Sequence, residues 1–384
     1  MPLVRGILRA TRTIPAVALV FAAAGCGYTP IDRGTGQSLP PDYASMQPEA
    51  PVSGHRYALD ADANIIGETQ VALSDYEDTF SDIARRFNLG YEAMKLANPD
   101  VDPWLPGDAT PTLLPTQFIL PDAPREGIVL NVAAMRLFYY PPTSETEMPA
   151  VITHPVGIGQ VEWATPTGTT EVVGKARDPV WYVPRSIREE HAAAGDPLPS
   201  IVPPGPDNPL GEFVLQLGIP GYLIHGTNQP YGVGMRVSHG CVRLYPEDIA
   251  PLFEDIPIGT PVHIVNQPYL LGWQNGHLYL EAHPPLADDE RAWNTEIIAL
   301  VSDAIEDAGY AERKIDWKRV QKVAEAGRGV PVSISKRTPG PESVLANARY
   351  VENTLPAGSN LSSDPAFEEP GESEDSALAR SDAD

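Results

Sequence analysis

The sequence predicts a mainly β protein, with a small α+β unit ahead of its β-rich centre and a short helical region after it. Two observations support this fold class. Strand-like runs bounded by proline and glycine fill residues 126–266. Amphipathic helical patterns concentrate instead in residues 56–122 and 287–326. Proline also makes up 42 of 384 residues, about twice its ordinary share, which is typical of an extended, loop-rich chain.

The first 25 residues have the composition of an export signal. Three early arginines precede an apolar stretch, residues 14–24, which is too short to span a membrane and ends in small side chains. The closing run AAGC resembles a bacterial lipobox, which implies cleavage before Cys26 and lipidation of its sulfur, and Gly27 favours the outer membrane. An ordinary signal peptide cut nearby is the alternative. We therefore expect a lipid-anchored protein in the periplasm of a Gram-negative bacterium.

Both flanks of the folded part are predicted to lack regular structure. Residues 26–55 are rich in proline, glycine and serine, which predicts a flexible tether. Residues 338–384 turn to proline, glycine, serine, asparagine and acidic side chains, and such a stretch cannot bury enough apolar surface to offset its chain entropy. We predict a disordered acidic tail there. The formal net charge of -24 argues against a nucleic-acid partner.

Residues 56–122 are predicted to form a strand–helix–helix–strand unit. Its helical patterns cover 79–87 and 91–97, and its strand-like pieces lie around 69–73 and 117–120. The order and size resemble the LysM fold, a module that binds N-acetylglucosamine-containing glycans such as peptidoglycan. The matching runs are DTF at 78–80, IA and RF within 83–87, ANP at 97–99 and WLPG at 104–107. A degenerate module that serves as a spacer is the alternative, because Glu77 replaces the usual glycine and the end of the motif is stretched.

Residues 126–266 are predicted to form an antiparallel, mainly β domain whose loops carry the chemistry. Only two helical patterns, at 186–194 and 247–254, interrupt the strand-like runs. Residues 133–135 contain no turn residue and predict a bulge or a tight reversal between two strands. Residues 267–337 add a hairpin that turns at an Asn-Gly pair and two helices split near Gly309. The pattern assigns this extension no function beyond packing or pairing.

The reactive side chains concentrate in residues 222–244, YLIHGTNQPYGVGMRVSHGCVRL. A hydrophobic run predicts a buried strand that delivers His225 to its end, and a glycine-rich loop follows. Cys241 then stands on a glycine-bearing turn shortly before a predicted helix start at Pro246. A helix N-terminus and a nearby imidazolium both lower a thiol pKa, so we expect a thiolate nucleophile at Cys241. If Cys26 carries lipid, Cys241 is a lone thiol in an oxidising compartment, where a buried structural cysteine is the alternative.

A thiol nucleophile needs a base for its proton and donors for the oxyanion that forms when it attacks a carbonyl. His225 and His239 both qualify as the base on these grounds, because one lies on the adjacent strand and the other two residues before the thiol. The backbone N–H groups of Gly240 and Cys241 are natural oxyanion donors. The residues alone leave the choice of base open.

Charge and metal binding are further interpretations of the same stretch. Arg236 and Arg243 suit a substrate that carries a carboxylate. His225, His239 and Cys241 could instead be three zinc ligands. No fourth ligand is convincing, and His-x-Cys is not a common zinc spacing. We therefore predict no metal.

The whole pattern resembles the signature of the YkuD-type L,D-transpeptidases. It consists of His-Gly-Thr from His225, a glycine-rich loop and Ser-His-Gly-Cys-Val-Arg ending at Arg243. The runs VGIGQVEWATPTGTTEV and DNPLGEF extend the similarity to the periplasmic, LysM-bearing branch of that family over residues 57–285. The resemblance implies a β-sandwich-like catalytic domain at 126–266 that needs no metal or organic cofactor.

The resemblance also implies a role for each residue of the site. Cys241 is the nucleophile, His225 accepts and returns its proton, and the carbonyl of Gly226 orients the imidazole in place of a triad's third member. The supporting assignments are His239 and Gly240 to the oxyanion region, Ser238 to loop support and Arg243 to the donor substrate's carboxylate. The resemblance thus selects His225 as the base.

The reaction implied is acyl transfer on peptidoglycan. The thiolate attacks the carbonyl that joins the third residue of a stem peptide to its terminal D-alanine, which leaves as a thioester forms. The acceptor is an amine of a neighbouring stem's diaminopimelate or of a lysine in an outer-membrane lipoprotein, whereas water would make the protein a carboxypeptidase or a wall-trimming hydrolase. The competing hypotheses are a non-catalytic wall-binding lipoprotein and a zinc hydrolase.

Overall fold

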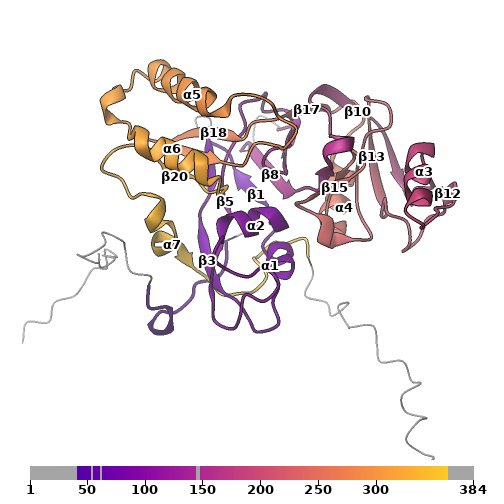
Figure 1. Cartoon of the computed structure of the whole chain (residues 1–384), viewed down its shortest axis with the longest axis horizontal. Coiled ribbons are helices and arrows are strands. Elements are labelled where there is room, and N and C mark those ends of the chain that lie inside the picture. Colours follow the sequence, from indigo (N-terminus) through magenta and orange to yellow (C-terminus); the bar gives the residue numbers. More distant parts are fainter. Residues whose placement is uncertain (1–40, 53–54, 61–62, 144–147, 362–384) are drawn as a thin grey trace, which may run out of the picture.

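The computed structural model describes residues 41–52, 55–60, 63–143 and 148–361 (Figure 1). The predicted export signal, the lipidation residue Cys26 and the acidic end from 362 onward lie outside these ranges. No helix within them is long and apolar enough to cross a membrane. The prediction of a mainly β protein is confirmed, because most elements are strands and the largest assembly is a single sheet.

A nine-stranded mixed sheet lies at the centre of the structure. In spatial order its strands are β1 (Arg56–Ala58), β8 (Ala150–Pro155), β7 (Arg136–Tyr140), β6 (Gly127–Asn131), β17 (Pro261–Val265), β10 (Gly168–Arg177), β13 (Phe213–Leu217), β14 (Leu223–His225) and β16 (Val242–Arg243). Most neighbours run antiparallel, but the pairs β6–β17 and β14–β16 are parallel. The antiparallel prediction is therefore wrong at these two pairs. In both cases a long connection joins the two strands. A connection of about a dozen or more residues can carry the chain back to the starting end of the first strand, so that the second strand runs in the same direction.

The side chains of this sheet alternate between two hydrophobic clusters, one on each face. In β6, Ile128 belongs to one cluster and its neighbour Val129 to the other. The first cluster gathers Ile152 of β8 and Val242 of β16, from near opposite ends of the sheet, so the sheet curls around it. Helix α4 (Pro246–Asp255) adds three buried apolar residues, Ile249, Leu252 and Phe253, to the same cluster. This core fixes β14 and β16, the two strands beside the reactive residues.

The α+β unit has the predicted strand–helix–helix–strand order. Its elements are β3 (Gln70–Leu73), α1 (Phe80–Arg86), α2 (Tyr91–Ala97) and β4 (Pro111–Leu114). Thr79 begins α1 with a capping box: its side chain accepts a bond from the Asp82 N–H, and the Asp82 carboxylate accepts one from the Thr79 N–H. The unit shares the hydrophobic cluster that contains Val129, so it packs on the outer face of the large sheet.

The strand that pairs with β3 is not the one predicted at 117–120, and the first strand within the predicted bounds 56–122 lies in the large sheet. β3 pairs with β4, whereas the strand expected at 117–120, β5 (Gln117–Ile119), pairs with β2 (Ile65–Gly67). β1, at the expected start of the unit, pairs with β8 and so belongs to the large sheet. Strand pairing depends on partners distant in the sequence, which local patterns do not reveal.

The region after the large sheet contains the expected hairpin and two helices. Its elements are β18 (Tyr269–Gln274), β19 (His277–Ala282), α5 (Trp293–Asp307), α6 (Trp317–Ala326) and β20 (Val332–Ser333). The hairpin turns at Asn275 and Gly276, whose φ angles of 52° and 73° are both positive, as a type I′ turn requires. Figure 1 shows α5 and α6 over the small sheet, and their buried residues share one cluster with it.

The chain is ordered beyond this region, so the disorder predicted for 338–384 is wrong over 338–361. The segment contains α7 (Val344–Asn347) and β21 (Arg349–Tyr350), and β21 pairs in parallel with β3. Val351 is 1% exposed in the cluster of the α+β unit. Glu49, inside the predicted tether, bridges to Val351 and is thereby held against the same unit. The prediction from composition failed here because this short polar segment pairs its backbone with a strand distant in the sequence and buries one side chain there.

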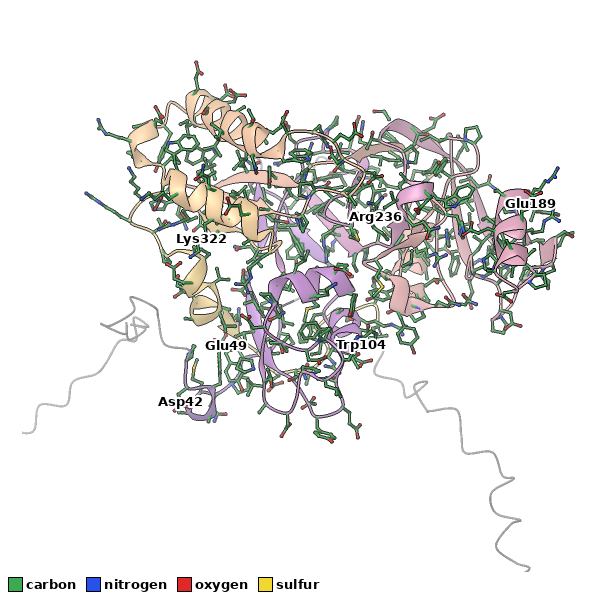
Figure 2. The ribbon with its side chains drawn as sticks, viewed as in Figure 1. Asp42, Glu49, Trp104, Glu189, Arg236 and Lys322 are labelled. Atoms are coloured by element: carbon green, nitrogen blue, oxygen red, sulfur yellow. The ribbon has the colours of Figure 1, made fainter. Side chains whose placement is uncertain are left out.

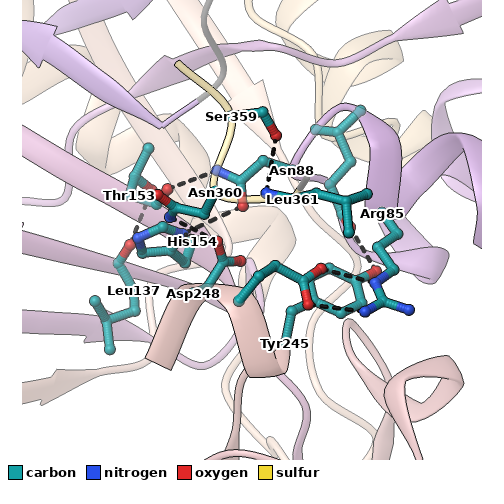
Figure 3. Close-up of polar contacts among 12 residues, drawn as sticks. Arg85, Asn88, Leu137, Thr153, His154, Tyr245, Asp248, Ser359, Asn360 and Leu361 are labelled. Atoms are coloured by element: carbon teal, nitrogen blue, oxygen red, sulfur yellow. Dashed lines mark hydrogen bonds and ion pairs between the residues drawn. The ribbon is translucent and has the colours of Figure 1, made fainter. Parts of the chain in front are cut away.

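The end of the described chain reaches a buried polar cluster between β8, α4 and the α+β unit (Figure 3). The Asp248 carboxylate, whose residue is 4% exposed, lies 3.1 Å from Nδ1 of His154 and accepts a hydrogen bond from Asn360 at 3.0 Å. The same Nδ1 lies 3.3 Å from the side-chain oxygen of Asn88. Helix α4, strand β8, Asn88 and the C-terminal segment therefore meet in this cluster, and α4 closely follows strand β16 in the chain.

Candidate active site

The parallel pairing of β14 with β16 places two of the predicted site residues, His225 and Arg243, on one face of the sheet edge. Ile224 lies opposite Val242, and both are buried in the core cluster. Because side chains alternate along a strand, His225 and its partner Arg243 face the other way. Cys241 comes two residues before Arg243 and begins the same face. The long loop between the two strands thus returns the chain to the sheet edge that holds His225, with Cys241 directly before β16.

The residue Cys241 is partly exposed, but protein atoms surround enough of its thiol to desolvate it. Its Sγ donates to the carbonyl oxygen of Gly221 at 3.7 Å. Burial raises the pKa of the thiol, and a backbone hydrogen bond with Leu223 and the charge of Arg243 oppose the rise without cancelling it. The thiolate expected from the sequence is therefore not the resting form. Strand β16 separates Cys241 from α4 in the chain, and burial outweighs the charges that would lower the thiol pKa.

His225 is buried at the end of β14. Its Nδ1 lies 2.5 Å from the carbonyl oxygen of Gly226. Burial, followed by the positive charge of Arg243, lowers the pKa of His225 to about 4, against backbone hydrogen bonds with Gly226 and Leu210 that act in the opposite direction. The imidazole is therefore neutral at neutral pH. With Nδ1–H donating to Gly226, Nε2 keeps a lone pair that can accept a proton.

His239 has quite different partners. Its Nε2 lies 3.1 Å from Oε2 of Glu190 on helix α3 (Arg185–Ala193), the helix on which Figure 2 labels Glu189. Its ring packs edge-on against Trp163 with the ring centroids 5.5 Å apart. The two histidines that the residues alone could not rank are thus distinct: His225 is buried against backbone carbonyls, and His239 is bonded to a carboxylate.

The turn before Cys241 has a backbone shape that requires glycine. Gly240 has a φ of +99°, and a Cβ atom there would lie 2.8 Å from the Tyr222 ring. The Ser238 hydroxyl donates to the carbonyl of Cys241 at 2.5 Å. Within the described ranges, the backbone N–H groups of Gly240 and Cys241 donate no hydrogen bond to the protein. Two donors are therefore free beside the sulfur, as an oxyanion site requires.

The two predicted arginines differ in what surrounds them. The Nε atom of Arg243 is buried without a hydrogen-bond partner in the described structure. Arg236, on β15 (Arg236–Ser238), pairs with Asp288 at 2.9 Å and donates its Nε to the Gly159 carbonyl at 3.1 Å. Figure 2 labels Arg236 near the middle of the molecule. Asp288 already occupies the carboxylate-binding side of Arg236, so Arg243 is the better placed cation for a substrate.

Two cavities adjoin these residues. The first, of about 610 Å³, is lined by Thr165, Arg236 and Asp288 among others. The second, of about 510 Å³, is lined by Gly226, Thr227 and residues of the neighbouring loops. Cys241 lines neither cavity. We therefore place the reactive centre at the glycine-bearing turn rather than inside either cavity.

Several contacts of the site come from residues that the sequence analysis did not single out. They are Trp163 and Thr165 ahead of β10, Glu190 on α3, Tyr222 beside Gly240, and Asp288 after β19. The first two lie in a run that carries the family resemblance, which was the available signal. Glu190 and Asp288 gave no signal in the sequence, because isolated acidic side chains are common on any protein surface.

A metal centre is not assembled from the residues proposed for one. Within the described ranges, no three or more His, Cys, Asp or Glu side chains are grouped to hold a metal ion. His225, His239 and Cys241 contact three separate partners, namely Gly226, Glu190 and Gly221.

Comparison with known proteins gives a consistent family match. A family model described as the L,D-transpeptidase catalytic domain, YkuD, matches residues 125–264. The probable L,D-transpeptidase YcfS of Escherichia coli strain K12 is 36% identical over 293 residues, which are 74% of this chain and 89% of that protein. The probable L,D-transpeptidase YbiS of the same strain is 39% identical over 285 residues, 73% of this chain and 92% of its own length. The probable L,D-transpeptidase ErfK/SrfK of Salmonella typhimurium is 40% identical over 260 residues, 67% and 82% respectively.

Proposed function

The chain belongs to the L,D-transpeptidase family, and on this premise we propose that it transfers peptidoglycan stem peptides through a thioester on Cys241. The observation that carries the assignment is the pair of unbonded N–H groups at Gly240 and Cys241, beside the thiol that they would serve. A neutral, buried His225 on the same sheet face supplies the base. These groups together match the needs of thiol-based acyl transfer.

The first half-reaction forms a thioester and releases D-alanine. Nε2 of His225 accepts the thiol proton of Cys241 as the sulfur attacks the carbonyl carbon that joins the third stem residue to the terminal D-alanine. A C–S bond forms, and the oxyanion accepts hydrogen bonds from the N–H groups of Gly240 and Cys241. The C–N bond then breaks, and the proton on His225 passes to the departing amine of D-alanine.

The second half-reaction reverses these steps with an acceptor amine, or water, in place of D-alanine. The acceptor amine attacks the thioester, His225 takes its proton, and the thiol reforms as the C–S bond breaks. A diaminopimelate amine of a neighbouring stem gives a crosslink. A lysine of an outer-membrane lipoprotein gives a protein tethered to the wall, and water gives a free tripeptide. The accumulated product therefore identifies the acceptor.

The charges of the resting site fit this order of events. A thiol with a raised pKa and an imidazole with a pKa of about 4 are both neutral, so no ion pair forms before the substrate arrives. Proton transfer then accompanies attack, after Sγ turns from the Gly221 carbonyl toward Nε2. The buried Nε of Arg243, unpartnered in the described structure, suits the carboxylate of the terminal D-alanine.

We also propose that the α+β unit binds wall glycan and that lipid on Cys26 holds the protein at the outer membrane, within the periplasm. Tyr76 and Trp104 are exposed large side chains on the β3–α1 and α2–β4 loops, and Figure 2 labels Trp104 beside that unit. The two loops meet where the Phe80 N–H donates to the Pro103 carbonyl at 2.8 Å. Exposed apolar groups gathered on adjoining loops are typical of a ligand-binding surface.

The test is the intact mass of the mature chain, carrying Cys26→Ser to keep it free of lipid, after mixing with a disaccharide-tetrapeptide. We expect an adduct equal to the substrate minus D-alanine, and none on the Cys241→Ala variant. A crosslinked dimer, a lipoprotein conjugate or a free tripeptide in the same samples reports the acceptor. Turnover that persists in the presence of a chelator would set aside the zinc hydrolase.

Two outcomes would contradict the proposal. Turnover by Cys241→Ala at the wild-type rate would remove the cysteine from the mechanism. The absence of both an adduct and released D-alanine would favour the non-catalytic wall-binding protein, which sedimentation with insoluble peptidoglycan would then test.

A further inference from the structure

Thr165 contacts the backbone of the glycine-bearing turn, and nothing in the proposed reaction uses it. We propose that Thr165 is a positioning residue for the oxyanion site: its hydroxyl holds the carbonyl of Gly240 and thereby directs the N–H of Cys241 toward the substrate. The inference rests on the proposed function and adds to it a residue that touches neither the substrate nor the sulfur.

The hydroxyl of Thr165 forms hydrogen bonds with two backbone groups. Oγ1 donates to the Gly240 carbonyl at 2.8 Å and accepts from the Gly159 N–H at 3.0 Å. A hydroxyl has one proton to donate, so this proton is used at Gly240. Thr165 is 9% exposed, which limits competition from water for either bond. The contact is therefore a buried side-chain bridge between β9 (Ile158–Gly159) and the turn.

The geometry of the peptide bond turns this contact into control of a donor. The carbonyl of Gly240 and the N–H of Cys241 belong to one planar trans peptide, so they point in opposite directions. When Thr165 fixes the carbonyl, the N–H is fixed as well. That N–H donates to no protein group in the described structure, although its own peptide is held. A backbone N–H that is fixed in direction and bonds no protein acceptor is the arrangement that stabilises a developing oxyanion.

The next peptide along the chain is held in the same way. The hydroxyl of Ser238 donates to the carbonyl of Cys241 at 2.5 Å. Hydroxyls therefore clamp the peptide planes on both sides of the nucleophile. Gly240 needs such a clamp, because its φ of +99° lies where glycine is free to move over a wide range.

The other end of the Thr165 bridge is itself anchored. A Cβ on Gly159 would meet the Trp163 carbonyl oxygen and would lie 2.9 Å from the Gly240 Cα, so the two segments approach as closely as glycine allows. The Gly159 carbonyl accepts the Nε of Arg236 at 3.1 Å, and Arg236 pairs with Asp288. Thr165 thus links the turn to a backbone segment that is itself held in place.

The experiment compares two reactions of the same sulfur. Formation of the thioester with the disaccharide-tetrapeptide creates an oxyanion, whereas alkylation by iodoacetamide displaces iodide at a saturated carbon and creates none. We expect Thr165→Val to slow thioester formation roughly 10- to 100-fold, less than the roughly 100- to 1,000-fold loss on removing an oxyanion donor outright. We expect alkylation to stay within about twofold of wild type, because the thiol and its surroundings are unchanged.

Three further variants sharpen the comparison, all in the mature chain with Cys26→Ser. Thr165→Ser keeps the hydroxyl and should retain most of the thioester rate. Thr165→Ala provides a second loss of the hydroxyl should the valine variant unfold on heating at a much lower temperature. Thr167→Val makes the same chemical change on a nearby exposed threonine and should leave both rates unchanged.

The outcomes separate this inference from the proposed function. A thioester rate in Thr165→Val equal to that of wild type would overturn the positioning role, and so would parallel losses in thioester formation and alkylation. Failure of the wild-type chain to form any thioester would overturn the proposed function and this inference together. A selective loss of thioester formation, restored by serine, supports the inference.

Discussion

Burial governs the chemistry of Cys241 and His225 as single side chains. Desolvation raises the pKa of the thiol and lowers the pKa of the imidazole to about 4, and Arg243 acts on both groups. Each side chain is therefore neutral at neutral pH. The backbone beside them is prepared in advance, because Gly240 holds a conformation that presents two free N–H donors. The proposed reactivity therefore rests on fixed backbone dipoles more than on a charged resting state.

Gly240→Ala tests how far this turn depends on glycine. A φ of +99° costs an alanine roughly 1–2 kcal/mol, and its Cβ would also lie 2.8 Å from the Tyr222 ring. We expect a modest loss of thermal stability together with loss of the thioester adduct. Gly259→Ala is the matched control, since Gly259 has a φ of +90° and open space around its Cβ position. Equal adduct formation by the two variants would show that the conformation of the turn is not needed.

Helix α4 is the element that ties strand β16 to the rest of the molecule. It begins three residues after β16, and Asp248 in its first turn contacts His154 of β8 and Asn360 (Figure 3). The neighbouring residue Glu247 forms a bidentate salt bridge with Arg85 of α1, with N–O distances of 2.7 and 2.8 Å. The large sheet, the α+β unit and the C-terminal segment therefore share one helix end.

Asp248→Asn should weaken the fold in a pH-dependent manner. Burial alone would raise the pKa of Asp248, but His154 and Asn360 outweigh it, and the net pKa lies below the ordinary value of 3.8. A depressed carboxylate pKa stabilises the fold above the unfolded-state pKa, and that contribution is lost as the pH falls through the folded-state pKa. We expect the variant to lose about 1–3 kcal/mol of unfolding free energy at pH 7 and less near pH 3.

Urea unfolding of wild type and variant at both pH values measures this difference. Asp255→Asn, on the same helix but exposed, is the control and should change little at either pH. A wild-type–variant difference that is constant or larger at pH 3 would contradict the assigned pKa shift. Both proteins should lose some stability between pH 6.5 and pH 4, because the lowered pKa of His225 makes the unfolded chain the stronger proton binder there.

At the scale of the whole molecule, the two ends of the described chain are bound to the same unit. Glu49 and Val351 form a β-bridge, and Arg349 pairs with Glu49 at 2.6 Å and with Glu68 at 2.7 Å. Through β21 and Asn360, the C-terminal segment then contacts both the α+β unit and α4. The α+β unit and helix α4 are thus fastened together by a segment that follows both in the sequence.

Truncation after Gly340 should therefore destabilise parts of the protein far from the deletion. It removes β21 and the buried Val351, and burying one such side chain stabilises by about 1.5–3 kcal/mol. We expect a lower temperature of unfolding and faster proteolysis in the α+β unit. Mass spectrometry of the proteolytic fragments locates the cleavage sites. Truncation after Leu361 is the control, because it leaves every contact described here in place. Identical unfolding temperatures for the two truncations would contradict the proposed fastening.

The elements that the sequence predicts well are those set by neighbours in the chain. α1 and α2 follow from helical spacing and from the Thr79 cap, and the hairpin follows from Asn275-Gly276, whose conformations are local. The candidate site around Cys241 is likewise readable from the sequence, because the cysteine, the glycine turn and Arg243 are close together in the chain. No contact between distant segments is needed to read these features.

The tertiary structure decided the features that depend on contacts across long stretches of chain. It paired β14 with β16 in parallel, ordered residues 349–351 on β3, and bound Thr165 to Gly240, 75 residues away. It also set the charge states of Cys241 and His225, because desolvation depends on everything packed around a group. The sequence by itself determined which family pattern and which candidate residues this chain carries, and the fold determined how those residues are held.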